Sequence, residues 1–142
     1  MFGDSTWWVV SLSTFSHFNR RSNEAWIREL ARVCKPDGLI LVTTHGGFAL
    51  ALISRSAEHQ KGLYMEASKA VDFLRRLGKE RFLFHGVPED LVEKLDGPEP
   101  EYGQAFFNER FVEEDWSEHV EMLGAVPVGL SLFQDFYALR PR

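Results

Sequence analysis

Cysteine is almost absent from this chain of 142 residues, which contains Cys34 and no other. A single cysteine excludes a disulfide within the chain. Cys34 falls near the end of a predicted helix, where we expect a small buried apolar side chain rather than a reactive thiol. A composition without disulfides is consistent with a reducing compartment, and we expect a cytoplasmic protein.

Long hydrophobic runs and an excess of positive charge are also missing. The longest apolar stretch, GGFALALI at residues 46–53, is far shorter than the ~20 residues of a membrane-spanning helix. The first residues show no basic segment followed by an apolar core and a small-residue cleavage site. The chain carries 16 Lys and Arg against 21 Asp and Glu, which disfavours a nucleic-acid backbone as partner. We therefore expect neither a membrane nor a nucleic acid as partner.

The histidines do not follow a metal-binding pattern. No two of them are spaced as ligands on one helix face: His17, His45, His59, His85 and His119. A metal centre built on histidine is therefore not expected.

An α/β pattern opens the chain. Residues 6–13, TWWVVSLS, form a run of aromatic and β-branched side chains that is typical of a strand buried on both faces. A helix is predicted over 23–35, with Ser22 or Asn23 as its cap and the turn KPDG as its end. Its apolar face is expected to consist of Trp26, Ile27, Leu30, Val33 and Cys34. The run LILVTTH at 39–45 predicts a second buried strand, so the three segments form a parallel βαβ unit.

The region from about 47 to 101 is interpreted as a helical and loop insertion. An amphipathic helix ending at Gly78 is predicted there from the spacing of Tyr64, Ala67, Val71 and Leu74. The acidic, proline-rich stretch over 87–101 predicts a solvated loop, with room for a short helical turn at 89–95.

The C-terminal region predicts a short helix and two strands. Asn108 can cap a helix over 109–116. Strands are predicted over 119–125 and 133–139, and the segment VPVG between them indicates an antiparallel pair. The expected fold class is therefore α/β, in a single domain over 1–142, with a parallel βαβ unit followed by an antiparallel C-terminal strand pair.

Two segments together have a recognisable pattern. In the first, VVSLSTFSHF is followed by a helix and by the turn RVCKPDG at 32–38. In the second, YGQAFFNERFVEEDW is followed by LFQDFYALRPR. The first resembles the fourth strand, following helix and fifth strand of class I S-adenosylmethionine-dependent methyltransferases. The second resembles the C-terminal part of a small-molecule subgroup, in which a Gln-Asp pair introduces the last strand.

The resemblance implies a partial Rossmann-like methyltransferase sheet. It covers roughly half of the chain and corresponds to the C-terminal half of the family's domain. The family holds its cofactor with a Gly-rich turn and an acidic residue, and neither has a match in this sequence. We therefore expect a truncated, split or degenerate methyltransferase with an incomplete site for S-adenosyl-L-methionine. The strand over 6–13 would lack a partner on one side, which favours self-association or a partner chain.

Two histidines follow the predicted parallel strands, where ligands of such sheets bind. His17 comes four residues after the first strand, and His45 ends the second, so both can face one cleft. Methyl transfer to a hydroxyl requires a base with a pKa near neutrality, which makes both histidines candidate catalytic residues. For each of them, the alternative is a structural bond to a backbone carbonyl.

Further contacts are implied by the resemblance. Cofactor contacts are expected from Ser11, Ser13 and Thr14, with capping of the strand end as the alternative. Substrate contacts are expected from Tyr102, Phe106 and Phe107, with core packing as the favoured alternative. For Gln134 and Asp135, which match the family's pair, a structural hydrogen-bonding role is expected.

Two functional hypotheses of different classes follow. The first is a partial S-adenosylmethionine-dependent methyltransferase that acts on an unknown small molecule. The second is a catalytically inactive methyltransferase-like module that binds a partner protein. The missing Gly-rich turn favours the inactive module for this chain. The turn RVCKPDG, in contrast, favours descent from a methyltransferase. An α/β hydrolase is disfavoured because no Gly-x-Ser-x-Gly motif is present.

Overall fold

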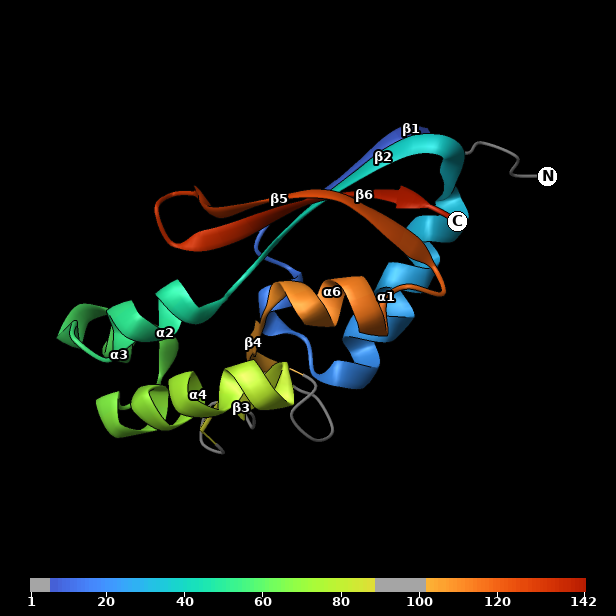
Figure 1. Ribbon diagram of the computed structural model, residues 1–142. Helices are drawn as coiled ribbons and strands as arrows, with labels where there is room; N and C mark the ends of the chain where they lie inside the picture. Colours follow the sequence, from blue (N-terminus) through green and yellow to red (C-terminus); the bar gives the residue numbers. More distant parts are fainter. Residues whose placement is uncertain (1–5, 89–101) are drawn as a thin grey trace.

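The computed structural model describes residues 6–88 and 102–142, and its main feature is a four-stranded mixed sheet (Figure 1). The strands lie in the order β1 (Thr6–Ser11), β2 (Cys34–Thr44), β6 (Gln134–Pro141) and β5 (Val120–Leu130). β1 and β2 are parallel, whereas β6 is antiparallel to both β2 and β5. The expected α/β class, with a parallel βαβ unit and an antiparallel C-terminal pair, is confirmed.

Helix α1 (Arg20–Val33) connects the two parallel strands and starts earlier than predicted. Asn19 caps it, because its side-chain oxygen accepts a hydrogen bond from the backbone N–H of Ser22 at 2.9 Å. Asn23, one of the predicted caps, lies inside the helix and is buried. Its side-chain amide donates to the carbonyl of Phe18 at 2.7 Å, which ties the first turn of the helix to the preceding loop.

The buried face of α1 differs in part from the predicted one. Ile27 is fully buried and Leu30 packs against the main core, as predicted. Trp26 is 49% exposed and stacks on Phe18, with the ring centroids 5.9 Å apart. The helical period therefore identified the residues at the centre of the apolar face correctly. Trp26 lies at the margin of that face, where its ring covers Phe18 and is not buried in the core.

β2 begins directly after α1, where the sequence predicted a turn at KPDG. Thr6 pairs with Cys34 but Trp8 pairs with Leu39, so β2 bulges over the residues between them. Gly38 lies in this bulge, where a Cβ would come within 2.9 Å of a carbonyl oxygen of β1. Cys34 is buried, as predicted, and burial raises the pKa of its thiol.

Three helices follow β2: α2 (Gly47–Ile53), α3 (Ala57–Leu63) and α4 (Ala67–Glu80). The last is the predicted amphipathic helix, but it runs through Gly78, which was the predicted stop. Its buried residues are Ala70, Phe73 and Leu77. The predicted face is wrong, since Tyr64 and Leu74 are exposed. None of the helices described combines the length and apolarity needed to cross a bilayer.

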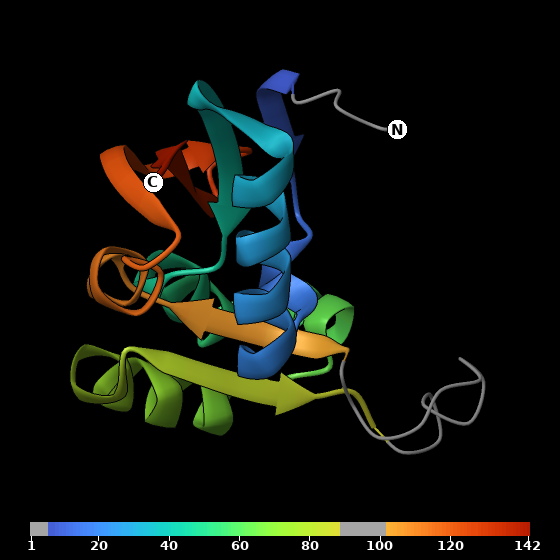
Figure 2. The same ribbon diagram turned by 90° about the vertical axis from the view of Figure 1, so that its right-hand side faces the viewer.

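A second sheet, which the sequence did not predict, pairs β3 (Phe82–Gly86) with β4 (Gly103–Phe107) in antiparallel orientation. Figure 2 shows its two strands side by side below the main sheet. The backbone N–H of Phe107 donates to the carbonyl of His45 at 3.0 Å, so the small sheet is joined to the end of β2. The predicted loop over 87–101, with its helical turn at 89–95, lies outside the described residues from 89 onward.

The C-terminal elements follow the prediction closely. Helix α6 (Glu109–Asp115) is capped by Asn108, whose side chain accepts a backbone hydrogen bond at 3.1 Å. β5 and β6 form the predicted antiparallel pair. Pro127 and Gly129, expected in the turn, lie inside β5, where the register shifts before Leu130. The predicted turn is therefore an irregular end of a longer strand.

Helices α1, α2, α4 and α6 and the small sheet lie below the main sheet as it is drawn in Figure 1, and two apolar clusters hold them in place. The first packs α1 and α6 against the sheet, and its largest fully buried side chains are Phe15, Phe107, Phe111 and Trp116. The second joins α2 and α4 to the small sheet through Leu50, Ile53, Phe73, Leu77 and Phe106. Aromatic side chains make up much of the buried volume of these clusters, in a sequence in which 13% of the residues are aromatic.

β1 is the edge strand of the main sheet, since among the described residues only β2 pairs with it. Trp8 is 65% and Val10 is 58% exposed, whereas Val9 between them packs against the first cluster. The expectation that this strand is buried on both faces is therefore wrong. Its apolar run is typical of a fully buried strand, but the described elements cover only one of its faces.

We predict that the chain self-associates through β1 at micromolar concentration. Within 6–88 and 102–142, the outer edge of this strand has backbone donors and acceptors without a partner beside exposed apolar side chains, which is a template for pairing with another strand. Val10→Lys places a charge on the exposed face without entering the core, and should shift the chain toward monomer in sedimentation velocity. Leu132→Lys, at a residue that is 78% exposed before β6, should leave the association unchanged. A monomeric unmodified chain with cooperative thermal unfolding would contradict the prediction.

Candidate functional site

The candidate site lies where β1 and β2 end side by side. Ser11 and Thr44 are the last residues of the two strands, and the chain then enters the short 3-10 helix η1 (Phe15–His17) and helix α2, respectively. β6 starts at the same edge, because it is antiparallel to β2 and Asp135 pairs with Thr44. Ligands of open α/β sheets bind beyond the carboxyl ends of the strands, so this edge is where binding is expected.

The structure brings His17 and His45 together, with ring centroids 6.0 Å apart. Nδ1 of His17 lies 3.0 Å from the carbonyl oxygen of Gly103. A carbonyl can only accept, so Nδ1 carries the proton and Nε2 is the acceptor of the neutral ring. Tyr102 stacks on the same imidazole with centroids 5.0 Å apart. The ring of His17 is thus held in one tautomer and one orientation by Gly103 and Tyr102.

His45 is in a different state, because it is 2% exposed. Burial, with a smaller contribution from His17, lowers the pKa of His45 to about 3, so the ring is neutral at physiological pH. Its Nε2 lies 3.5 Å from the side-chain nitrogen of Gln134, at the outer limit of a hydrogen bond. An amide nitrogen donates, which makes Nε2 the acceptor and places the proton on Nδ1. A ring that binds protons so weakly suits positioning better than proton abstraction.

Gln134 links this histidine to the loop after β1. Its side-chain nitrogen donates to Oγ of Ser13 at 2.8 Å. The backbone N–H of Ser13 in turn donates to Oγ1 of Thr43 at 2.8 Å. Ser13 has a φ of 56°, a left-handed conformation that costs a non-glycine residue about 1 kcal/mol or more. These hydrogen bonds hold the strained loop in place.

Asp135, next to Gln134, connects the start of β6 to β5. One carboxylate oxygen accepts a hydrogen bond from the backbone N–H of Val128 at 3.0 Å, and burial raises the pKa of the carboxyl. Gly46 leaves the room for it, since a Cβ at that position would lie 2.0 Å from the other carboxylate oxygen. The contacts of Gln134 and Asp135 agree with the structural hydrogen-bonding role expected for this pair.

The three predicted cofactor-binding residues lie in different settings. Ser13 belongs to the hydrogen-bonded cluster around Gln134. The hydroxyl of Thr14 donates to the carbonyl of Leu12 at 3.2 Å, which is a local bond within the loop. Ser11 is half-buried within β1. Cofactor binding by these residues stays a prediction.

The three predicted substrate-binding aromatics are also separated. Tyr102 is 47% exposed and covers His17. Phe106 is fully buried, with its ring centroid 5.5 Å from that of His45. Phe107 is fully buried on the other side of β4, against Trp116 in the first cluster. Phe106 and Phe107 are packed in the core, which was the favoured alternative for these residues. Substrate contact by the three aromatics stays a prediction.

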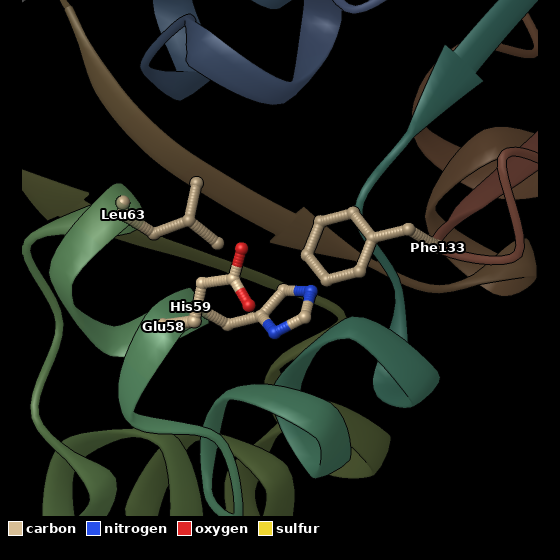
Figure 3. Close-up of a pocket in the computed structure, with 5 residues that line it drawn as sticks. Glu58, His59, Leu63 and Phe133 are labelled. Atoms are coloured by element: carbon tan, nitrogen blue, oxygen red, sulfur yellow. The ribbon is translucent and has the colours of Figure 1, made fainter.

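Two residues next to the site were missed by the sequence analysis. Phe133 packs edge-on against His45 with centroids 5.0 Å apart, and its ring stacks on His59 at 5.3 Å. Figure 3 shows Phe133 beside His59 in the lining of a pocket next to α3. The one available signal was the position of Phe133 directly before the Gln-Asp pair. No pattern pointed to His59, which lies in the segment interpreted as a helical and loop insertion.

Two buried polar atoms of the cluster are left without a hydrogen bond among the described residues. Nδ1 of His45 and Oε1 of Gln134 have no hydrogen-bond partner within the described part of the chain, and an unpaired buried group costs about 1–3 kcal/mol. The N–H of His45 and the side-chain carbonyl of Gln134 are a donor and an acceptor, and the hydroxyl and amino groups of an adenosyl ligand can form hydrogen bonds with groups of both types. The Gly-rich turn and the ribose-binding acid have no match in the sequence, so the correspondence with S-adenosylmethionine is limited to these polar groups. Over 6–88 and 102–142, no three His, Cys, Asp or Glu residues are grouped to hold a metal ion.

Comparison with known proteins supports the fold. No protein-family model and no curated protein matches the sequence. Among solved structures, the chain is similar to the PH0226 protein from Pyrococcus horikoshii OT3, with a TM-score of 0.53 and 13% identity over 98% of this chain and 53% of that one. The chain therefore spans about half the length of PH0226. A weaker likeness, with a TM-score of 0.49 and 12% identity, is to PKMT2 from Rickettsia typhi in complex with AdoHcy, over 94% of this chain and 35% of that one.

We predict that His45 makes the protein less stable as the pH falls from neutrality. A histidine in the unfolded chain binds its proton near pH 6.5, but buried His45 does so only near pH 3. Between these values the unfolded state binds more protons, so the free energy of unfolding should fall by about 1.4 kcal/mol for each pH unit lost. Urea unfolding at pH 7 and pH 5 measures this change in the free energy of unfolding. His45 should account for about 2 kcal/mol of the difference between the two pH values.

The matched variants separate His45 from the other titrating groups. His45→Gln should lose this share of the pH dependence, because its amide does not titrate. His119→Gln, at a half-buried histidine just before β5, should keep it. An unchanged pH dependence in His45→Gln would show that the buried ring is not the group responsible.

Proposed function

We propose that the chain forms the substrate side of an S-adenosylmethionine-dependent methyltransferase that acts on a small molecule. The observation that carries the proposal is the pairing of His17 and His45 beyond the carboxyl ends of two adjacent parallel strands. The segments that resemble the family support it, because they form the neighbouring strands β1, β2 and β6 of one sheet. All three strands meet at the edge where the polar cluster lies.

In this proposal His17 is the general base. Its Nδ1–H is bound to the carbonyl of Gly103, so Nε2 is the atom that takes a proton from the hydroxyl of the acceptor molecule. The ring is only partly buried, so an acceptor can reach it. The bound cofactor supplies an electrophilic methyl group on its sulfonium.

His45 and Gln134 serve as positioning residues. The N–H at Nδ1 of His45 donates to the ligand, and Oε1 of Gln134 accepts from it, so two buried groups gain partners. Phe106 and Phe133 flank the imidazole of His45 and exclude water from that side. A dry, fixed polar surface of this kind orients a reactant without reorganising during the reaction.

The second candidate function, an inactive module that binds a partner protein, also has a specific observation in its favour. Trp8 and Val10 expose most of their side chains on the outer face of β1. Exposed apolar surface of this kind marks protein interaction sites. In that case the polar cluster would serve only to hold the strand ends together.

An NMR titration of the full chain with S-adenosylhomocysteine distinguishes the two functions. We predict weak, saturable binding with Kd about 1 mM, or about -4 kcal/mol, because the Gly-rich turn and the acid have no match. The amide signals over 11–14 and the ring signals of His17 and His45 should shift. Absence of shifts at these residues would refute the proposed function and favour the binding module, and micromolar affinity would contradict the expectation of an incomplete site.

Histidine variants provide the control for this titration. His17→Ala should weaken binding severalfold, because the ring forms one wall of the site. His119→Ala removes a histidine far along the chain from the cluster, and should bind like the unmodified chain. Equal affinity of the two variants would remove His17 from the site.

A further inference from the structure

A pocket of about 300 Å³ opens between α3 and the turn that leads into β6 (Figure 3). Its lining consists of Glu58, His59, Gly62, Leu63 and Phe133. Small-molecule sites have volumes of about 300–1,000 Å³ and combine apolar walls with a few polar groups. This pocket has the volume of a site for a small ligand, with an aromatic and an aliphatic wall, one imidazole and one carboxylate.

The wall formed by α3 is fixed by hydrogen bonds. Oγ of Ser56 accepts the backbone N–H of His59 at 3.3 Å and also lies 2.7 Å from Nδ1 of its ring. The side chain of Gln60 donates to the carbonyl of Ile53 at 2.8 Å, which ties α3 to the end of α2. The imidazole of His59 is therefore held in place, and the pocket is preformed rather than assembled by a ligand.

Phe133 is the shared wall between this pocket and the histidine cluster. Its ring stacks on His59 with an interplanar angle of 25°, and its edge meets His45 at 74°. Leu63 and Phe133 also pack against the second apolar cluster, so the pocket is continuous with the core. A ligand that stacks in the pocket would thus lie one aromatic ring away from His45.

Charge in the pocket comes from Glu58. Figure 3 shows its carboxylate directed into the space bounded by Leu63, the ring of His59 and the ring of Phe133. Within the described residues, no Lys or Arg forms an ion pair with it. A carboxylate beside apolar walls favours a ligand that brings its own cation, and disfavours an anion of the same shape.

We propose that this pocket binds a small aromatic amine, with its ring against Phe133, His59 and Leu63 and its ammonium group beside Glu58. Describing the pocket as the acceptor subsite of a methyltransferase rests on the proposed function. The binding of the amine itself rests on the pocket alone.

Two probes of similar size and opposite charge test the proposal on the full chain. 2-Phenylethylamine and phenylacetate share a ring and differ in the charge of their short tail. In an NMR titration, 2-phenylethylamine should bind saturably and shift the signals of His59, Leu63 and Phe133. Phenylacetate should bind at least about tenfold more weakly, because its carboxylate meets that of Glu58.

Charge-neutral variants assign the preference to one carboxylate. Glu58→Gln keeps the shape of the side chain and should lower the affinity for 2-phenylethylamine about fivefold, the effect of one exposed ion pair. Glu66→Gln makes the same change at an exposed residue outside the pocket, before α4, and should bind the amine like the unmodified chain. Equal affinity for the two probes, equal effects of the two variants, or no saturable binding would each overturn the proposal.

The two proposals can be refuted independently, because the two titrations are followed through the signals of different residues. Amine binding at His59 without S-adenosylhomocysteine shifts at 11–17 would refute the methyltransferase function and leave the amine pocket standing. S-adenosylhomocysteine shifts at 11–17 without amine binding at His59 would refute the amine pocket.

Discussion

The structure depends above all on the burial of β2 between a parallel and an antiparallel neighbour. Its inner side chains Ile40 and Val42 are fully buried, which is possible because β1 and β6 satisfy its backbone on both edges. The burial continues through Thr44 and into His45 after the strand ends. A polar residue that would ordinarily lie in a solvated loop is thus carried into the interior, and its neutral state follows from that position.

His45 is also where the two apolar clusters meet. Its carbonyl accepts the backbone N–H of Phe107, which belongs to the first cluster, and its ring contacts Phe106 and Phe133 beside the second. An imidazole N–H that is buried without a partner among the described residues destabilises a junction whose role is purely structural. Buried polar groups of this kind are typical of sites that take a ligand, which is why the junction is the centre of the candidate site.

The outer face of β1 and the carboxyl edge of the sheet are neighbouring surfaces. β1 ends at Ser11, and the loop after it reaches the cluster through Ser13 and Gln134. A further strand paired with the open edge of β1 would therefore end beside this loop and add residues to the site. The predicted association through β1 and the proposed ligand binding at the carboxyl edge are therefore compatible with each other, and the exposed Trp8 and Val10 would take part in the first.

The sequence by itself determined the strand, helix and strand at the start of the chain and the antiparallel pair at its end, because these elements follow from local periodicity and capping residues. It also placed His17 and His45 after adjacent strands. Tertiary structure alone decided the pairing of β3 with β4, the buried face of α4, the exposure of β1 and the approach of Phe133 and His59. Each of these depends on which segments pack together across long sequence separations, and burial, pKa and pocket shape follow from that packing rather than from any local pattern.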